Sequence, residues 1–280
     1  MIIFKRSESV LNYLRQQKNH GKKIGFVPTM GALHQGHVSL IEAAKSENDV
    51  VVCSIFVNPT QFNNTQDFTH YPITIEEDIL KLHNTGCNVL FLPAEREIYP
   101  LDYKAPHYAL GIIENILEGK YRPGHFQGVC QVMDRLLQVI GPTNLYMGQK
   151  DLQQCIVVKK LLQLTNREAS VHLHISPTVR EATGLAMSSR NMRLSSSEKA
   201  LATNIHEALQ RIQQELNQKL FSELKVTATR QLESVGFIVD YVEIAHTEDL
   251  SIANNADSQV AALIAATIGN VRLIDNLILN

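Results

Sequence analysis

Two histidines three residues apart follow a short apolar run near the start of the chain. His34 and His37 close the stretch Pro28–His37, which also contains Gly31 and Gly36. Residues with this spacing share one face of a helical turn, and glycines let a ligand approach the backbone closely. A helix N-terminus suits phosphate because its N–H groups are free and its dipole end is positive. We expect two imidazoles above an anion-binding helix end, although so short a motif also fits an ordinary β–α turn with surface histidines.

Gln61 lies just past a second apolar run. The segment Asp49–Val57 is β-branched and has no polar alternation, as in a strand buried on both faces of a parallel sheet. Ligands of open α/β sheets bind beyond the carboxyl ends of the strands. An amide at such an end offers the donor and the acceptor needed to hold a hydroxy acid. Taken alone, Gln61 is better interpreted as a polar loop residue without a role in binding.

A lysine opens the helix expected after the strand Asn144–Met147. Lys150 stands in the run Gly148–Asp151, where a cation opposes the helix dipole. A bound anion would offset this local conflict. Asp151 could accept a hydrogen bond from a ribose hydroxyl, or it could be a plain first-turn carboxylate. Gln154, one turn further on, would face the same cleft.

Two hydroxyls stand beside a guanidinium in a later polar loop. Ser188, Ser189 and Arg190 can together hold phosphate oxygens. Gly184, earlier in the loop, would let this segment move as a lid. The alternative is a polar linker that binds nothing.

The acidic run Glu76-Glu77-Asp78 opens another expected helix. Acidic side chains suit the positive end of the helix dipole, so a solvated first turn is the ordinary interpretation. One of these carboxylates could still hold Mg²⁺ through water, because Mg²⁺ keeps several waters and uses few carboxylates. His172 and His174 lie on one face of an expected strand and suit a sheet surface better than a metal site.

Composition excludes several classes of protein. The 280 residues suffice for one large domain or two smaller ones, and the net charge of -2 argues against a broad nucleic-acid footprint. Four widely spaced cysteines fit reduced thiols. The N-terminus has no signal-peptide pattern, and the longest apolar runs fall short of the ~18–20 residues of a membrane span. We therefore expect a soluble, cytoplasmic protein.

Strand and helix patterns alternate up to Ser176. Strands are expected at Ile24–Val27, Asp49–Val57, Asn88–Leu92, Asn144–Met147 and Val171–Ile175, and helices at Ser9–Lys18, Val38–Ser46, Thr74–Thr85, Gln127–Ile140 and Lys150–Thr165. This order predicts βαβ units and a parallel sheet with right-handed crossovers. The segment Tyr99–Leu110 has no clear pattern.

The character of the chain changes after Ser176-Pro177. A capping signal at Ser195–Glu198 precedes a helix to about Leu220, and a second helix runs to about Ser234. Three strand patterns follow, at Phe237–Ile244, Gln259–Thr267 and Val271–Leu279. We predict an α/β protein with a parallel-sheet domain at residues 1–176 and a smaller α+β domain at residues 177–280.

The ordered set of motifs closely resembles the pantothenate synthetase (pantoate–β-alanine ligase) family, of the His-x-Gly-His nucleotidyltransferase-like superfamily. The matching segments are Pro28–His37, Phe56–Phe62, Arg122–Phe126, Gly148–Gln154, Met187–Asn191, Asp240–Glu243 and Arg272–Asp275. Together they span nearly the whole chain. The resemblance implies a Rossmann-like ATP- and pantoate-binding domain, a C-terminal lid domain and a homodimer.

The resemblance also implies a reaction. ATP would activate (R)-pantoate as an acyl adenylate with release of pyrophosphate, and β-alanine would then displace AMP to give pantothenate, with Mg²⁺ required. Adenylation supplies the leaving group that a carboxylate lacks, so the protein has to align reactants and stabilise phosphate charge. Small-molecule substrates are the partners expected, without nucleic acid or membrane.

Residue roles follow from the matched motifs. The catalytic residues implied are His34, His37, Lys150 and Arg190. The ATP site implied comprises Met30, Gly31, Ala32, Leu33, His34, Gln35, Gly36, His37, Gly148, Gln149, Lys150, Asp151, Val179, Met187, Ser188, Ser189 and Arg190. Gln61 and Gln154 would hold pantoate, Gln61 would also meet β-alanine, and Glu77 and Asp78 would meet the metal through water.

Some positions depart from the family pattern. Gln149 stands where glutamate is usual, which removes a charge beside the ATP site. Ile73 and Leu152 replace a common arginine and a common aromatic residue, and Glu77 stands where aspartate is usual. Two alternatives stay open. One is a nucleotidylyltransferase with the same histidine turn, and the other is a catalytically idle relative that only binds its ligands.

Overall fold

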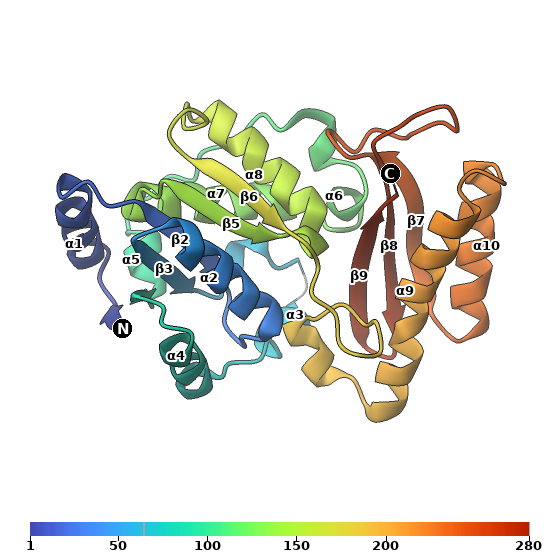
Figure 1. The fold of residues 1–280 in the computed structure, drawn as a ribbon, viewed down its shortest axis with the longest axis horizontal. Coiled ribbons are helices and arrows are strands. Elements are labelled where there is room, and N and C mark those ends of the chain that lie inside the picture. Colours follow the sequence, from blue (N-terminus) through green and yellow to red (C-terminus); the bar gives the residue numbers. More distant parts are fainter. Residues whose placement is uncertain (64, 280) are drawn as a thin grey trace.

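Two separate β-sheets organise the chain. The computed structural model describes residues 1–63 and 65–279; Asn64 and Asn280, the last residue of the expected second domain, lie outside the described residues. A six-stranded sheet occupies one half of the molecule and a three-stranded sheet the other (Figure 1). The predicted α/β class, with a parallel sheet and a smaller α+β unit, is confirmed.

The larger sheet is parallel throughout and has the strand order β1-β4-β3-β2-β5-β6. Its strands are β1 (Ile2–Phe4), β2 (Ile24–Thr29), β3 (Val50–Ile55), β4 (Val89–Phe91), β5 (Asn144–Gly148) and β6 (His172–Ser176). Five of them match predicted strands. The edge strand β1 was not predicted, because its three half-exposed or exposed residues carry no periodic signal.

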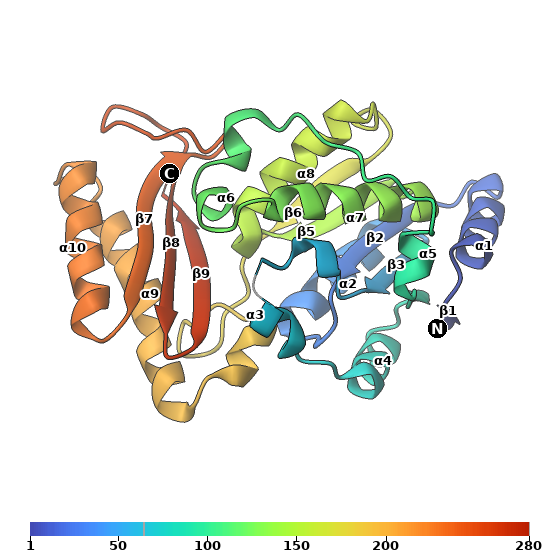
Figure 2. The same cartoon turned by 180° about the vertical axis from the view of Figure 1, so that it is seen from behind.

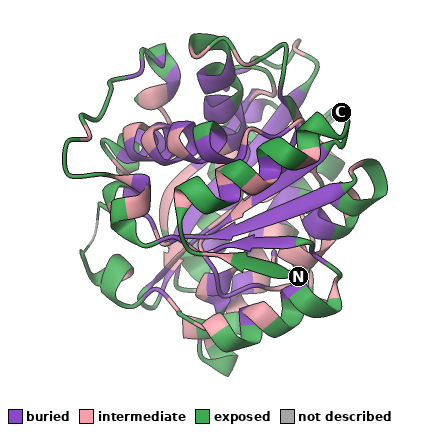
Figure 3. Cartoon of the chain, turned by 90° about the vertical axis from the view of Figure 1, so that its left-hand side faces the viewer, coloured by how far each residue is buried: buried purple, intermediate pink, exposed green. Residues whose placement is uncertain are grey.

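Helices cover both faces of this sheet. The helices in this half of the chain are α1 (Ser7–Asn19), α2 (Gln35–Glu47), α3 (Thr65–Thr69), α4 (Ile75–Asn84), α5 (Glu95–Ile98), α6 (Glu118–Tyr121), α7 (His125–Ile140) and α8 (Leu152–Leu164); α1, α7 and α8 pack on one face of the sheet, and α2 and α4 on the other. In β3, Val50 and Val52 pack toward α1, α7 and α8, whereas Val51 and Cys53 pack toward α2 and α4. The strand is therefore buried on both faces, as its apolar run predicted, and Figure 3 shows the buried strands between helices with exposed outer sides.

The smaller sheet is antiparallel, in the order β7-β8-β9. Its strands are β7 (Ile238–His246), β8 (Val260–Ile268) and β9 (Val271–Ile278), and α9 (Ser196–Glu215) and α10 (Phe221–Ser234) pack on it. The predicted capping box at the start of α9 is present, because Ser195 and Glu198 bond each other's backbone N–H groups. Within the described part of the chain, no helix is both long enough and apolar enough to span a membrane.

The edge strand β9 faces the larger sheet. In both views β9 is the strand of the small sheet nearest to the other half of the molecule, and β5 and β6 point their carboxyl ends toward it (Figures 1 and 2). We propose that the domain division lies near residue 176, as the separation of the two sheets supports.

A buried ion-pair network joins the two halves. Glu118 of α6 is only 6% exposed, and Arg272 of β9 donates to both of its oxygens at 2.7 Å. Arg272 also contacts Asp240 of β7 at 2.6 Å, and the Tyr241 hydroxyl donates to Glu118 at 2.9 Å. Burial raises the pKa of Glu118, but the hydrogen bonds and charge of Arg272 more than offset this, so the pKa is lowered.

Arg272→Ala is expected to lower the free energy of unfolding by about 3 kcal/mol, because it leaves the buried Glu118 carboxylate without its principal partner. Urea titration would measure the loss. Arg211→Ala is the control, since Arg211 makes an exposed i,i+4 pair with Glu215 that is worth at most about 0.5 kcal/mol. Equal losses in the two variants would contradict this account of the network.

Candidate active site

The turn between β2 and α2 holds its shape through a buried carboxylate. Gly31 has φ +86° and Ala32 has φ 49°, a left-handed backbone that favours glycine. Asp78 of α4, which is 0% exposed, accepts from the backbone N–H groups of Ala32 at 2.9 Å and Leu33 at 2.7 Å. Lys81, one turn further along α4, donates to the Leu33 carbonyl at 2.7 Å. The turn that precedes the histidines is thus fixed from the neighbouring helix.

The two histidines cap α2. His34 is the N-cap, and its Nδ1 accepts from the Gly36 N–H at 3.2 Å. Nδ1 of His37 accepts from the His34 N–H at 3.2 Å, and the ring centroids are 4.0 Å apart. Helix α2 therefore begins at Gln35, three residues before the predicted start. Because both Nδ1 atoms accept hydrogen bonds, each neutral imidazole carries its proton on Nε2.

Burial and neighbouring cations keep both rings neutral. Burial, followed by the charge of Lys150, lowers the pKa of His34 to about 4. Burial and then the proximity of His34 lower the pKa of His37 well below its usual value. At neutral pH, in the absence of an anion, the site thus presents two neutral N–H donors. A bound polyphosphate would favour the protonated form of either ring.

The carboxyl end of β5 brings Lys150 to the same cleft. Gly148 ends β5, and a short 3-10 helix, Gln149–Asp151, leads into α8. The Lys150 ammonium lies 3.6 Å from an Asp151 carboxylate oxygen. The Gln149 side chain does not line the cleft; it donates to Asn276 of β9 at 3.1 Å.

The loop after β6 returns to the cleft from the other side. Ser189 donates to the Ala32 carbonyl at 2.9 Å, so this loop is attached to the histidine turn. Arg190 is paired with Asp67 of α3 at 2.7 Å, and Arg193 contacts the same carboxylate at 2.8 Å. Burial lowers the pKa of Arg190, but the hydrogen bond and charge of Asp67 outweigh burial, so the pKa is raised. The guanidinium expected to meet phosphate thus already holds a carboxylate.

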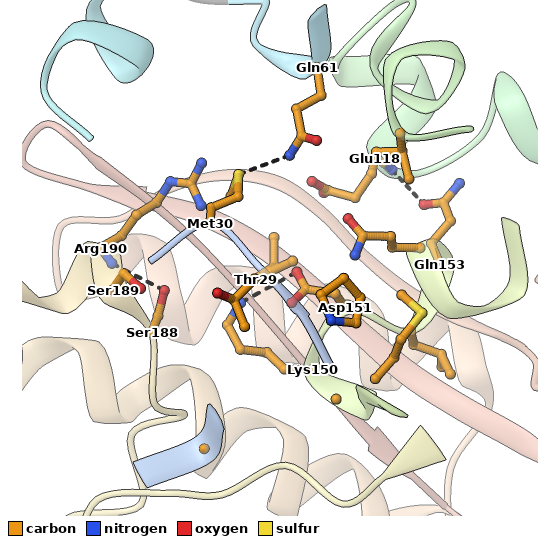
Figure 4. Close-up of a pocket in the computed structure, with 18 of the residues that line it drawn as sticks. Thr29, Met30, Gln61, Glu118, Lys150, Asp151, Gln153, Ser188, Ser189 and Arg190 are labelled. Atoms are coloured by element: carbon orange, nitrogen blue, oxygen red, sulfur yellow. Dashed lines mark hydrogen bonds and ion pairs between the residues drawn. The ribbon is translucent and has the colours of Figure 1, made fainter. Parts of the chain in front are cut away.

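Gln61 and Gln154 line the inner part of the cleft. Gln61 lies just past β3 and is 8% exposed, with its amide nitrogen 3.1 Å from the Met30 sulfur (Figure 4). Asn58 donates to the Gln61 side-chain oxygen at 3.2 Å, which orients the amide. The cleft wall beside them is apolar and comes from α7: Val129, Val132, Met133 and Leu136.

Most residues expected at the site meet in this one cleft. The lining includes Met30, His34, Gly36, His37, Gln61, Gly148, Lys150, Asp151, Gln154, Val179, Met187, Ser188, Ser189 and Arg190. Gly31, Ala32 and Leu33 instead form the buried turn beneath it, and Gln35 is exposed on α2. Glu77 is exposed, and both oxygens of Asp78 already serve the backbone of the turn.

Other side chains at the cleft were not assigned to the site from the sequence, which left open whether His125 is structural or belongs to the active site. Arg122 lines it, close to Glu118 at 3.8 Å, and burial lowers its pKa to about 10. His125 is buried and donates from Nδ1 to the Gln61 carbonyl at 2.8 Å, and burial, with the charge of Arg122, lowers its pKa to about 3. The motif Arg122–Phe126 signalled both residues, whereas nothing near Glu118 in the sequence did.

A parallel α/β sheet with imidazoles, a lysine and an arginine gathered beyond its strand ends defines a nucleotide-using enzyme with a His-x-Gly-His turn. Residues 2–278 match the pantoate-beta-alanine ligase family. The pantothenate synthetase of Cytophaga hutchinsonii is 44% identical, with 95% of each chain covered. The pantoate–beta-alanine ligase of Dictyostelium discoideum is 43% identical, with 92% of this chain and 88% of that one covered.

Solved structures agree with the sequence relatives. The crystal structure of pantothenate synthetase from Thermus thermophilus matches with a TM-score of 0.93 at 35% identity and covers 100% of this chain and 99% of its own. The pantoate-beta-alanine ligase of Francisella tularensis, complexed with beta-gamma ATP and beta-alanine, matches with a TM-score of 0.82 at 42% identity, over 99% and 97%. The chain belongs to the pantoate–β-alanine ligase family.

The free energy of unfolding of the ligand-free protein is expected to fall as the pH drops from 6.5 toward 4. In the unfolded chain His34 takes up a proton near pH ~6.5, but in the folded protein its pKa is about 4. The unfolded state therefore binds more protons across this window, and His34 contributes a slope of up to about 1.4 kcal/mol per pH unit. Urea titrations at a series of pH values would measure it.

His34→Asn is the matched variant for this measurement. Asparagine can also cap a helix by accepting from a backbone N–H, but it does not titrate. Its stability should decline less steeply than that of the unmodified protein over the same pH range. Parallel curves would show that His34 is not the group responsible.

Proposed function

We propose that this chain joins (R)-pantoate to β-alanine with ATP and yields pantothenate, AMP and pyrophosphate. One observation carries the proposal beyond family membership. Donors and cations suited to a polyphosphate share a single cleft with two glutamine amides and an apolar wall. That combination suits an enzyme that has to hold a nucleotide and a small hydroxy acid side by side.

The nucleotide would lie along the histidine turn. The Nε2–H groups of His34 and His37 would donate to phosphate oxygens at the N-terminus of α2, where the dipole also favours negative charge. Lys150 and Arg190 would neutralise further phosphate charge, and Ser188 and Ser189 would add hydroxyl donors. Val179 and Met187 line the same cleft, where they would meet the base. Asp151 would accept from the ribose.

Pantoate would lie deeper, between the glutamines and the apolar wall. Gln61 and Gln154 can donate to its carboxylate and bond its hydroxyls, while the dimethyl-substituted carbon of pantoate suits the aliphatic side chains of α7. The Asn58 contact at 3.2 Å supports this role, because it fixes the orientation of the Gln61 amide before substrate enters.

Two displacements would follow in this cleft. A pantoate carboxylate oxygen attacks the α-phosphorus of ATP, and the bond to the bridging oxygen breaks as pyrophosphate leaves. The amine of β-alanine then attacks the acyl carbon of pantoyl adenylate, AMP departs with the bonding electron pair, and the amine loses a proton. The fixed donors of His34 and His37 stabilise the charge that develops on phosphate oxygens.

Mg²⁺ would accompany ATP and reduce the charge of its phosphates. Among residues 1–63 and 65–279, no group of three or more His, Cys, Asp or Glu side chains could hold a metal. This donor set fits an ion carried mainly by phosphate oxygens and water. Glu77 would act only through water, and Asp78 would act chiefly by holding the turn.

Further proposals concern the second substrate and the assembly. The Francisella tularensis relative, solved with beta-gamma ATP and beta-alanine, supports ATP and β-alanine as substrates of this chain. Gln61 would meet β-alanine as well as pantoate. We also propose a homodimer and a cytoplasmic location, as family resemblance implies.

An AMP-release assay with each substrate omitted in turn tests the reaction. Release should require ATP, Mg²⁺, pantoate and β-alanine together, while exchange of labelled pyrophosphate into ATP should need only pantoate and Mg²⁺. Exchange that needs a phosphorylated acceptor would identify a nucleotidylyltransferase instead. A complete mixture without AMP release would point to a relative that only binds ligands.

His37→Ala should lower turnover by roughly 10²-fold or more, because it removes a fixed donor to the developing phosphate charge. Steady-state AMP release would give the ratio. His172→Ala is the control, since His172 is exposed on β6 outside the cleft. Near-normal turnover of the His37 variant would exclude the role assigned to this ring.

Gln61→Ala should raise KM for pantoate by roughly tenfold, as the loss of one or two hydrogen bonds does, and should change KM for ATP much less. Initial rates with each substrate varied would separate the two constants. Gln213→Ala, on the exposed side of α9, should change neither. A larger effect on ATP than on pantoate would mean that the pocket is misassigned.

A further inference from the structure

The end of β9 is bonded directly to the backbone that carries Lys150. Asn276 is 2% exposed, and its amide nitrogen donates to the carbonyls of Gln149 and Lys150, each at 2.9 Å. Its side-chain oxygen accepts from the Gln149 amide at 3.1 Å. All three contacts cross from the small sheet to the loop at the end of β5.

Gln149 sets the orientation of the Asn276 amide. Because the Gln149 nitrogen donates to the Asn276 oxygen, the Asn276 NH₂ group is directed at the two backbone carbonyls. A glutamate at position 149 could not donate in this way. The glutamine at position 149 therefore has a structural consequence: it fixes one hydrogen-bonding arrangement at this contact.

The preceding residue of β9 secures a second loop of the cleft. Asp275 is 4% exposed. Its carboxylate accepts hydrogen bonds from the two terminal nitrogens of the Arg180 guanidinium, at 2.6 and 3.0 Å. Arg180 follows Val179, whose carbonyl accepts from the Met187 N–H at 3.0 Å. Two adjacent residues of one strand thus hold the segments that carry Lys150, Val179 and Met187.

We propose that Asn276 is a positioning residue of the nucleotide site, which sets the place of Lys150 through the backbone carbonyls of Gln149 and Lys150. This inference rests on the proposed function, since it assumes that Lys150 meets ATP. A lysine ammonium contributes to charge stabilisation only from a defined position, and small displacements of such groups are costly. The two hydrogen bonds that the Asn276 amide donates fix this position from the C-terminal unit.

A structural role and a positioning role predict different kinetics. Loss of general packing between the halves would impair ATP and pantoate alike, because both bind in the same cleft. Misplacement of Lys150 acts on ATP, whereas the two pantoate residues are held by other contacts: Gln61 by Asn58 and Gln154 by the backbone of α8. The ratio of the two KM changes therefore separates the roles.

Two variants of Asn276 and one control test the proposal. Asn276→Ala removes both donors without adding charge. Asn276→Asp keeps the shape and the acceptor for Gln149 but cannot donate to the carbonyls. Asn255→Ala is the control, because the Asn255 side chain also makes two backbone contacts in the C-terminal unit, to Phe221 at 3.0 Å and Lys219 at 3.2 Å, away from the cleft.

The measurements are KM for ATP and for pantoate, binding of α,β-methylene-ATP with Mg²⁺ by calorimetry, and the unfolding temperature. Both Asn276 variants should raise KM for ATP and weaken binding of the analogue by roughly tenfold, as loss of hydrogen bonds that fix a phosphate-contacting group does. KM for pantoate should stay within about twofold, and Asn255→Ala should leave all three constants unchanged.

Several results would overturn the proposal. Unchanged ATP constants in either Asn276 variant would do so, as would equal increases in both KM values. Failure of both variants to fold would show that Asn276 serves the fold as a whole. Failure of the proposed function is a distinct outcome, because the unmodified protein itself would then release no pantoate-dependent AMP. Binding of the ATP analogue could still be compared between the unmodified protein and the variants.

Discussion

The buried carboxylate of Asp78 is the contact on which the site depends. It accepts the N–H groups of two successive residues in the left-handed turn, and so holds the backbone where β2 stops and α2 begins. Without such an acceptor these buried N–H groups would lack partners, at a cost of about 1–3 kcal/mol each. The orientation of both imidazoles follows from this turn, because each is bonded to the first turn of α2.

The cations of the cleft are paired with carboxylates, and a ligand can take the place of these carboxylates. His34 and His37 stay neutral because burial and Lys150 disfavour their protonation, while Arg190 is neutralised by Asp67. Lys150 has a loose partner in Asp151, at 3.6 Å. The resting site therefore avoids a cluster of like charges yet retains donors for phosphate, and the two halves of the molecule close around it through Glu118 and Arg272.

Local signals in the sequence predicted most of the fold and the lining of the cleft. The β-branched run of β3 indicated a strand buried on both faces, and motifs after strand ends placed His37, Lys150 and Gln61 together. The start of α2 was predicted too late, because histidine is an unusual N-cap. Asp78 resembled a solvated first-turn acid, since its partners lie 45 and 46 positions away. Asn276 was missed for a similar reason, because its partners lie 126 and 127 positions away.

If Arg190 meets the nucleotide as proposed, its pairing with Asp67 makes nucleotide binding an exchange of anions. A phosphate group that takes the place of this carboxylate, held at 2.7 Å, gains only the difference between two ion pairs. Dissolved salt screens the pair that is broken as well as the pair that is formed. We therefore expect nucleotide affinity to depend on ionic strength less steeply than the number of cations in the cleft suggests, a slope that binding titrations at several salt concentrations would report.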